Sequence, residues 1–436
     1  MKPLFIISCP IDTYSGYGAR SRDIVKSLIK LDTYDVKILP QRWGNCPWGF
    51  IDDHPEEWGY LNSHLLPPGP NLPKQPEIWA QVTVPNEFQP VGKYNIGFTA
   101  GIETTLVSPV WIDGMNKMDV NFVSSNHSKN VFLNSKFNQQ DPKTQQIVRE
   151  IKIEKPIEVL FEGVNLETYF PKKSNFNLDQ TEEDFAFLFV GHWMQGEIGE
   201  DRKNVGEMIY AFLNTFKNKK KTPALILKCS GAGNSYLDRE TMLNKIQQVK
   251  ERVEGAVKLP NIYLLHGELN DTEMNELYNH KKVKAMVSLT RGEGFGRPLL
   301  EFSMTKKPII TTNWSGHLDF LSPKFTTLVS GELTNVHPSA SAKDMLLEES
   351  SWFKANNVEF SYYLRDMFEN YKTYKEKSVK QFYKGKKEFS LKGMEILLGG
   401  YLKNYVPEFP SLVKLKLPKI KKIELPKIKK LENVEG

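Results

Sequence analysis

The chain has 436 residues, of which 40% are hydrophobic and 25% are charged, proportions typical of a soluble globular protein. This length suits two domains better than a single core, and no apolar run approaches the about 20 residues that a membrane-spanning helix needs. Residues 411–436 hold eight lysines and three glutamates, so they carry five of the six net positive charges. The rest of the chain is nearly neutral, which argues against a dedicated nucleic-acid-binding protein.

The first 165 residues alternate short apolar runs with helical patterns. We expect strands at 4–9, 36–39, 78–82, 96–99, 120–124 and 157–160, and helices at 19–31, 109–117 and 128–134. Residues 40–76 break this alternation with many Pro, Gly and Trp residues and little periodicity. They are predicted to form a long loop insertion, a feature that is often functional in a compact domain.

A polar stretch at 170–184 precedes a second series of the same kind. Strands are expected at 186–190, 224–229, 262–266, 285–289 and 308–311, and helices at 205–216, 239–254, 272–280 and 298–304. Alternation of strands and helices in both halves predicts two doubly wound parallel sheets. Residues from about 340 to 405 have a mostly helical pattern.

The three cysteines, Cys9, Cys46 and Cys229, are far apart in the sequence. They exclude a disulfide framework and a thiolate metal site, and they favour a reducing compartment. The apolar N-terminus has no cleavage site before the polar loop that follows it, so it is interpreted as a buried strand rather than a signal peptide. We therefore expect a cytoplasmic location.

The segment from Ser288 to Glu301 carries most of the chemistry. A glycine-rich turn follows a buried strand there and leads into a helix, whose unpaired N–H groups favour a diphosphate or a polar sugar. Gly294 and Gly296 allow the backbone to approach a ligand closely. Glu293 ends the strand and Glu301 lies one turn into the helix, so both can face the crevice in which doubly wound folds bind ligands.

Glu293 to Glu301 resembles the E-x7-E signature of the family-4 retaining glycosyltransferases of the GT-B fold. Flanking segments at 162–171, 266–278 and 307–317 are also similar to that family, and the resemblance is closest over about 155–330. It implies two Rossmann-like domains that face a cleft. It also implies that Glu293 and the amides of Gly294, Phe295 and Gly296 hold the donor sugar, while Glu301 holds the nucleotide ribose.

The resemblance implies two basic residues that neutralise the diphosphate just after the first strand of the second domain. Arg202 and Lys203 are assigned to this role, although their spacing departs from the family pattern, and Lys228 is a second candidate. In the first domain, Gly16 and Gly18 lie in a turn that would approach the diphosphate across the cleft. The alternative is a tight turn without a ligand.

The same turn is close to a dinucleotide fingerprint, but Ser21 stands where the third glycine belongs. The acidic residue expected after the second strand is missing, because Asp35 precedes that strand instead. NAD binding is therefore disfavoured. The sequence also lacks a D-x-D pair, so no metal and no cofactor are expected beyond the nucleotide sugar, which is a co-substrate.

Glu103 is the titratable group in the stretch 98–104, where the family often has a histidine near the reacting sugar. It is assigned a catalytic role beside Glu293, in positioning the acceptor or the donor sugar. His127 is a weaker alternative, because a histidine at the start of a helix more often belongs to the cap region. In this family the leaving diphosphate itself helps to deprotonate the acceptor.

The resulting division assigns 1–169 to an acceptor-side Rossmann-like domain, 170–184 to a linker and 185–385 to a Rossmann-like donor domain. Residues 386–410 form a helix that returns to the first domain. Residues 411–436 form a flexible lysine-rich tail with an eight-residue repeat, in which Pro418 and Pro426 prevent a continuous helix. The tail would allow peripheral binding to an anionic surface, either a membrane or a nucleic acid.

The leading hypothesis is a retaining glycosyltransferase that moves a hexose or pentose from a nucleoside-diphosphate sugar to a hydroxyl of a glycan or another acceptor. UDP, GDP and ADP all remain open as the nucleotide. One alternative is the same chemistry on hydroxymethylated bases in DNA. Another is a non-catalytic protein that binds nucleic acid or membrane on a relic GT-B fold, but the intact Glu293 and Glu301 argue against decay.

Overall fold

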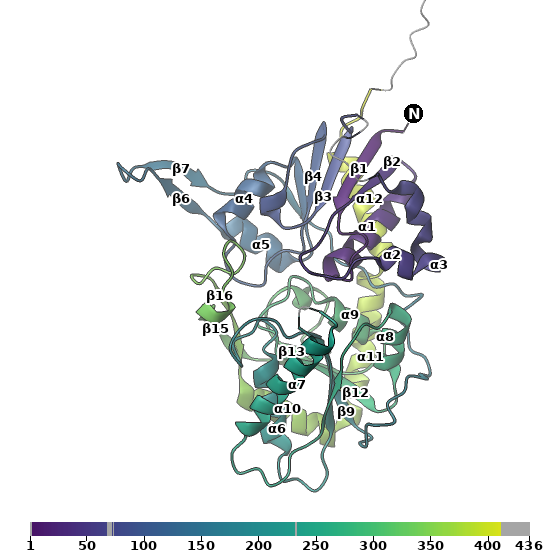
Figure 1. Ribbon diagram of the computed structural model, residues 1–436, viewed down its shortest axis with the longest axis vertical. Coiled ribbons are helices and arrows are strands. Elements are labelled where there is room, and N and C mark those ends of the chain that lie inside the picture. The colour runs from purple at the N-terminus through teal and green to yellow at the C-terminus, as the bar shows by residue number, and fades with distance from the viewer. Residues whose placement is uncertain (1, 68–71, 73, 232, 411–436) are drawn as a thin grey trace, which may run out of the picture.

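The computed structural model describes residues 2–67, 72, 74–231 and 233–410, so the lysine-rich tail at 411–436 lies outside the described residues. The chain forms two domains, one above the other in Figure 1, and each contains a six-stranded sheet in which all neighbouring strands run parallel. The prediction of two Rossmann-like domains is confirmed. No helix in the described part of the chain is long and apolar enough to cross a membrane.

The first sheet has the strand order β2-β1-β3-β4-β5-β8. Alternate side chains of β1 enter two different cores: Phe5 and Ile7 pack on one face of the sheet, and Leu4 and Ile6 pack on the other. Burial on both faces explains why this strand is apolar throughout. The strands are β1 (Leu4–Cys9), β2 (Asp35–Pro40), β3 (Ile78–Val82), β4 (Tyr94–Phe98), β5 (Val120–Val123) and β8 (Ile157–Val159).

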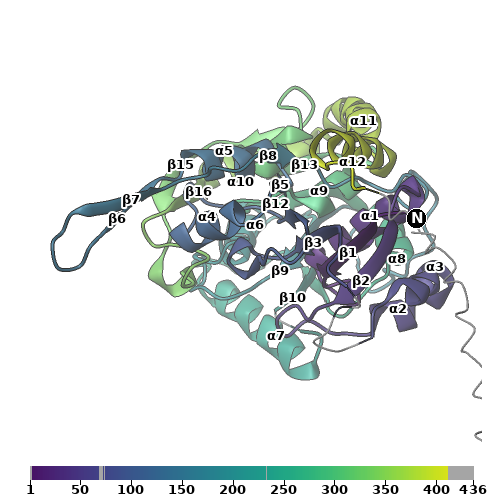
Figure 2. The same ribbon diagram turned by 90° about the horizontal axis from the view of Figure 1, so that it is seen from above.

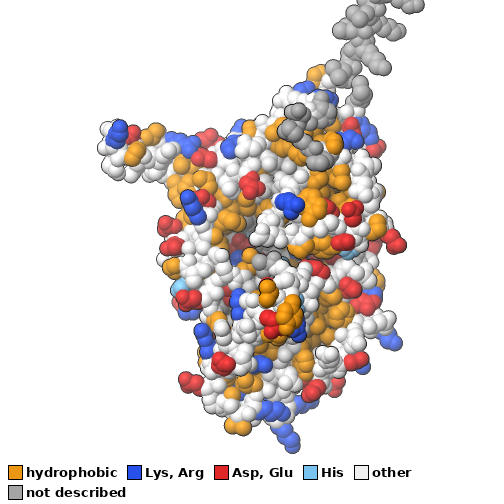
Figure 3. Space-filling model, viewed as in Figure 1, with side chains coloured by type: hydrophobic (Ala, Val, Ile, Leu, Met, Phe, Trp, Pro, Cys, Tyr) orange, Lys and Arg blue, Asp and Glu red, His pale blue; other side chains and the backbone are white. Residues whose placement is uncertain are grey.

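The helices of the first domain are α1 (Gly16–Leu31), α4 (Pro109–Asn116) and α5 (Asn126–Asn134), with a 3-10 turn η2 (Pro85–Glu87). A hairpin of β6 (Phe137–Gln140) and β7 (Ile147–Ile151), which the sequence did not predict, projects from this domain in Figures 1 and 3.

The insertion at 40–76 was predicted to be a loop, but its described residues include three short helices. They are α2 (Phe50–Asp53), α3 (Pro55–Trp58) and η1 (Gly59–His64). The guanidinium of Arg22 on α1 lies 3.4 Å from the centre of the Phe50 ring, and Trp58 and Leu61 are buried in the same core as α1. The insertion is therefore fastened to the first domain by a cation–π contact and by apolar burial.

The second sheet has the strand order β11-β10-β9-β12-β13-β14. Its strands are β9 (Ala186–His192), β10 (Ala224–Ser230), β11 (Ile262–Leu265), β12 (Val283–Ser288), β13 (Ile309–Thr312) and β14 (Thr327–Val329). Its helices are α6 (Val205–Phe216), α7 (Tyr236–Glu251), α8 (Asp271–Asn279), α9 (Arg297–Ser303) and α10 (Asn357–Glu369), with 3-10 turns η3 (Gly316–Asp319) and η4 (Pro338–Ala340). An antiparallel hairpin of β15 (Gly331–Asn335) and β16 (Ser351–Ala355) interrupts the region that was expected to be mostly helical.

The chain crosses between the domains twice. It leaves the first domain after β8 and returns through α11 (Tyr371–Glu388) to α12 (Leu391–Tyr405), which packs on α1. Figure 2 shows α11 and α12 together on one side of the molecule. The two segments that cross between the domains are hydrogen-bonded to each other through the backbone. Val164 N donates to Phe389 O (2.9 Å), and Leu391 N donates to Val164 O (2.8 Å). A β-carbon at Gly163 would lie 2.4 Å from the Leu391 Cα, so this approach requires glycine.

Candidate functional site

Both sheets reverse their strand order at a point that faces the other domain. β1 lies between β2 and β3, and β9 lies between β10 and β12. In doubly wound sheets such a reversal opens a crevice at the carboxyl ends of the strands. Gly16 follows β1, Arg202 and Lys203 follow β9, and Glu293 follows β12. The topology thus brings residues from distant parts of the sequence to the same crevice.

A cavity of about 930 Å³ lies between the domains, and Figure 3 shows the surface hollowed along their boundary. Of the residues predicted to bind the donor, Gly16 and Glu301 line this cavity. The loop after β11, from Glu268 to Asp271, lines it from the second domain. The volume is enough for a nucleotide-sized ligand.

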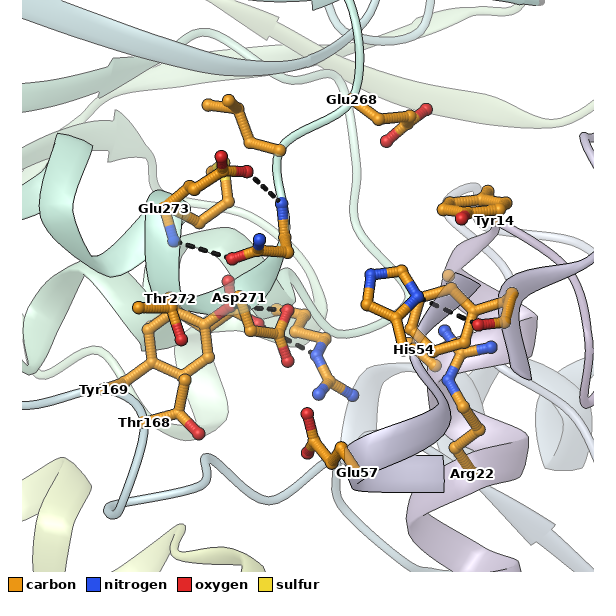
Figure 4. A pocket seen from close by; sticks show the side chains of 18 of the residues that line it. Tyr14, Arg22, His54, Glu57, Thr168, Tyr169, Glu268, Asp271, Thr272 and Glu273 are labelled. Carbon is orange, nitrogen blue, oxygen red and sulfur yellow. Dashed lines mark hydrogen bonds and ion pairs between the residues drawn. The ribbon is translucent and has the colours of Figure 1, made fainter. Parts of the chain in front are cut away.

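The insertion at 40–76 forms one wall of the cavity, a role that the sequence did not reveal. Figure 4 shows Tyr14 and His54 on one side of the pocket and Tyr169 and Asp271 on the other. The His54 ring stacks on Phe50 with their centroids 4.3 Å apart, and the Tyr14 ring lies edge-on to Phe50 at 5.1 Å. This aromatic wall is a suitable surface for a flat base.

Glu301 is held inside the cavity wall by Arg297. The Arg297 Nε lies 2.9 Å from the Glu301 carboxylate, and the Arg297 Nη1 lies 2.6 Å from Asp23 of the first domain. Burial raises the pKa of Glu301 to about 7, although the Arg297 guanidinium opposes this shift, and the nearby Asp271 carboxylate adds to it. Glu301 therefore changes its charge near neutral pH.

Glu293 lies in a compact group of four charges. Its carboxylate accepts a hydrogen bond from the Lys203 ammonium and lies 3.8 Å from Arg202, which also bonds Glu103 of the first domain at 2.9 Å. Burial alone would raise the pKa of Glu293, but the Lys203 and Arg202 charges hold it below its ordinary value. The four predicted residues therefore meet, with each cation paired to a carboxylate.

The glycine turn after Glu293 packs directly against the first domain. A β-carbon at Gly294 would lie 2.6 Å from the Ala100 carbonyl oxygen. Gly296 has a φ of +95° and precedes α9, so it needs the left-handed conformation that glycine adopts readily. The Phe295 side chain is buried against Phe320, 5.0 Å between centroids, and only its backbone is available to a ligand.

Gly18 does not line the cavity, in contrast to Gly16. It lies in the first turn of α1, where a β-carbon would come within 2.3 Å of the Thr13 carbonyl oxygen, so close packing accounts for this glycine. Lys228 donates to the Gly267 carbonyl at 2.6 Å and thereby braces the loop after β11. His127 lies at the start of α5, where its ring meets Trp314 of the second domain. Among the described residues, no group of three or more His, Cys, Asp or Glu side chains could hold a metal ion.

Residues 200–357 match the family described as glycosyl transferases group 1. This match contains Arg202, Lys203 and the whole segment from Glu293 to Glu301. The comparison with curated proteins finds no match.

Solved structures with the same architecture cover nearly the whole chain. A glycosyltransferase from Rickettsia africae has a TM-score of 0.60 at 12% identity and covers 93% of this chain and 99% of its own. HepE from Anabaena in complex with UDP has a TM-score of 0.59 at 12% identity, covering 93% and 100%. Sucrose-phosphate synthase from Thermosynechococcus elongatus has a TM-score of 0.57 at 11% identity, covering 93% and 99%. At such identities the likeness shows the GT-B fold, and the match to glycosyl transferases group 1 covers residues 200–357, the part of the chain that holds Glu293 and Glu301.

Proposed function

We propose that this protein is a retaining, metal-independent glycosyltransferase that transfers a hexose or pentose from a nucleoside-diphosphate sugar to an acceptor hydroxyl. The observation that carries the proposal is a cavity between the domains that Gly16 and Glu301 line, together with the buried Lys203–Glu293 ion pair, whose Glu293 lies in the same strand–turn–helix segment as Glu301. HepE, which has the same fold, was solved in complex with UDP-glucose, and this favours a nucleotide sugar as the donor here.

The nucleotide occupies the open cavity in this proposal. The base lies between the aromatic wall of the insertion and the loop at Glu268, and the ribose hydroxyls donate to Glu301. Carboxylates suit this role because they accept hydrogen bonds from neighbouring hydroxyls. The sugar then points from the cavity toward Glu293.

The diphosphate is neutralised by Arg202 and Lys203. Both side chains are largely buried and held by carboxylates, Arg202 by Glu103 and Lys203 by Glu293. Phosphate oxygens replace these partners when the donor binds, so no uncompensated cation has to be buried in the free enzyme. Glu293 is then free to accept hydroxyls of the donor sugar.

The reaction breaks the bond between the anomeric carbon and the diphosphate oxygen, and the bonding electrons pass to that oxygen. Arg202 and Lys203 stabilise the growing negative charge, and Glu293 stabilises the positive charge that develops on the sugar ring. The acceptor oxygen bonds the anomeric carbon on the face that the diphosphate leaves, and its proton passes to the diphosphate. Glu103 positions the reacting groups through Arg202 and does not need to act as a strong base.

A panel of UDP, GDP and ADP tests the proposal by thermal shift, followed by nucleotide release from the corresponding nucleotide sugars. A nucleotide present at a hundredfold excess over its dissociation constant should raise the free energy of unfolding by about 2.7 kcal/mol. If no nucleoside diphosphate stabilises the protein and no nucleotide sugar is turned over, the proposal is wrong.

The lysine-rich segment 411–436 supports a second part of the proposal, from its sequence alone. Eight lysines against three glutamates would attach the enzyme to an anionic surface through salt-sensitive contacts. Cosedimentation with vesicles that contain phosphatidylserine, with and without this segment, provides the test. Equal binding of both forms would contradict it.

A further inference from the structure

Three buried ring nitrogens near Glu293 have no hydrogen-bond partner in the described part of the chain. They are Nε2 of His127, Nε1 of Trp314 and Nδ1 of His317. Buried polar atoms in folded proteins are nearly always bonded, and each exception needs an explanation. A ligand group that completes these bonds is one such explanation.

The rings of His127 and Trp314 meet across the domain boundary, and His317 is near enough to His127 to affect its pKa. The His127 ring on α5 meets the Trp314 ring at right angles across the domain boundary, with 5.0 Å between centroids. A β-carbon at Gly296 would lie 3.0 Å from the His317 Cβ, so His317 lies beside the glycine turn that follows Glu293. Phe353 of β16 lies parallel to Trp314 at 6.2 Å and supports it from the second domain.

The hydrogen bonds that these rings make show whether each remaining ring nitrogen is a donor or an acceptor. The His317 Nε2 lies 2.7 Å from the Thr312 carbonyl oxygen, which can only accept, so Nε2 carries the proton and Nδ1 is an acceptor. Burial lowers the pKa of His127 to about 4, and a backbone interaction with Thr104 opposes this shift only weakly, as a carbonyl that accepts from the other ring nitrogen would. Both imidazoles are therefore neutral near pH 7, with one free acceptor each.

The Trp314 Nε1–H is a donor only, so the set offers two acceptors and one donor. An anion could accept a hydrogen bond from Trp314, but the lone pairs on the two histidine nitrogens would repel it. An ammonium group could donate to the two histidines, but it could not accept a hydrogen bond from Trp314. Hydroxyl groups both donate and accept, so several hydroxyls on one molecule match the set. The face of a tryptophan beside such polar atoms also suits the C–H surface of a sugar ring.

We propose that His127, Trp314 and His317 form a hydroxyl-binding subsite that positions a carbohydrate acceptor beside Glu293. The inference rests on the proposed function, because Glu293 must hold the donor sugar for this place to be the acceptor side. It selects a glycan over a hydroxymethylated DNA base, which would present a single hydroxyl on a flat aromatic ring.

The test uses the full chain and two substitutions that remove one atom group each. Trp314→Phe deletes the N–H but keeps an aromatic ring against His127 and Phe353, and His127→Asn deletes Nε2 but keeps an N–H near the position of Nδ1. Trp111→Phe is the matched control, because the Trp111 Nε1 is equally buried and unpartnered but lies in the core of the first domain.

An array of oligosaccharides and methyl hexosides, probed with nucleotide sugar, identifies the acceptor by transfer. We expect a carbohydrate acceptor whose KM rises at least tenfold in Trp314→Phe and in His127→Asn but less than twofold in Trp111→Phe. Calorimetry with the free nucleoside diphosphate should show normal affinity in all three variants, which also reports that they fold.

Two results would overturn the inference while leaving the proposed function intact. One is transfer to hydroxymethylated duplex DNA but to no glycan on the array. The other is a Trp314→Phe enzyme whose acceptor KM equals that of Trp111→Phe. Failure of every nucleotide sugar to bind the unmodified protein would instead refute the proposed function, and this inference would fall with it.

Discussion

The two halves of the cleft differ in how far they are formed without a ligand. The half around Glu301 is an open cavity of about 930 Å³. The half around Glu293 is packed, with the glycine turn against Ala100 and both cations paired to carboxylates. Under the proposed function, the half around Glu301 is open to the nucleotide, while the half around Glu293 must exchange its internal ion pairs for those of the donor.

The two glutamates show the same contrast in their pKa values. Glu301 is buried beside one guanidinium, which it shares with Asp23, and its pKa rises to about 7. Glu293 is equally buried, at 7% exposure for each residue, but two cations hold its pKa below the ordinary value. Burial is the same for both carboxylates, so the neighbouring charges account for the difference: two cations face Glu293, whereas Glu301 has one cation and the nearby carboxylates of Asp271 and Asp23.

The largest expected effect is on turnover. Glu293→Gln should lower kcat by about 100- to 1000-fold, the range found when one electrostatic contact to a transition state is removed. Free nucleotide should bind no more weakly, because Glu293 does not line the cavity and only pairs with a cation that the diphosphate needs. Steady-state kinetics beside calorimetry with the nucleoside diphosphate measures both quantities. Glu276→Gln is a control, since it breaks a Lys–Glu pair of 2.9 Å away from the cavity.

The second effect is on nucleotide affinity. Glu301→Gln should weaken nucleoside diphosphate binding by about 1.5–3 kcal/mol, the usual contribution of a hydrogen bond to a charged group, and it should leave kcat nearly unchanged. Glu56 lines the same cavity, so Glu56→Gln controls for the loss of one negative charge there. If Glu293→Gln weakens nucleotide binding and Glu301→Gln does not, the sugar-binding and nucleotide-binding roles of these two glutamates are assigned in the wrong order.

A third, smaller effect is the pH dependence of binding. Ribose hydroxyls donate to ionised Glu301, so nucleotide affinity should rise as the pH increases through about 7, by at most tenfold per unit, and then level off. The free energy of unfolding should change in the opposite direction. The pKa of Glu301 in the folded state exceeds the ordinary 4.5, so the folded state binds more protons than the unfolded state. The stabilisation that Glu301 contributes therefore falls as the pH rises from 4.5 to about 7. Calorimetry across this range should give a flat profile for Glu301→Gln. A slope that persists in the variant would exclude Glu301 as its origin.

The smallest effect is expected from chelation. Lys203 and Arg202 supply the positive charge next to Glu293, so EDTA should leave the rate of nucleotide-sugar turnover unchanged. An enzyme that stops with EDTA and recovers with manganese or magnesium would show that these two side chains are not sufficient counter-charges.

The strands of the two six-stranded sheets were predicted from the sequence more accurately than the two antiparallel hairpins, β6–β7 and β15–β16. Leu4–Cys9 and Ile78–Val82 have the predicted bounds because short apolar runs between turn signals are typical of strands buried on both faces. The hairpin at β7 lacks this signal, since Ile147 and Val148 are 59% and 65% exposed. The β15–β16 hairpin touches the first domain through Thr105 and Ser351, a long-range contact that leaves no periodic pattern in the sequence.

The candidate site was predictable where its residues share one motif. Glu293 and Glu301 follow one apolar strand and flank a glycine-rich turn, and this combination, rather than their spacing alone, predicted that both face one crevice. The ion pair between Glu103 and Arg202 joins the two domains. No local pattern in the sequence predicts such a contact. The same holds for His127, which was interpreted as a cap-region histidine, because its neighbour Trp314 lies across the domain boundary.

The paired crossings at Val164 and Leu391 tie the two connections between the domains together at one place. Sliding one domain past the other would break both backbone hydrogen bonds at this place, so the easier motion is a rotation about it. A rotation that opens the cleft would separate Arg202 from Glu103 and Asn126 from Asp319 in the same step. In the proposed function, the rotation that admits the donor would therefore also release the two cations for the diphosphate.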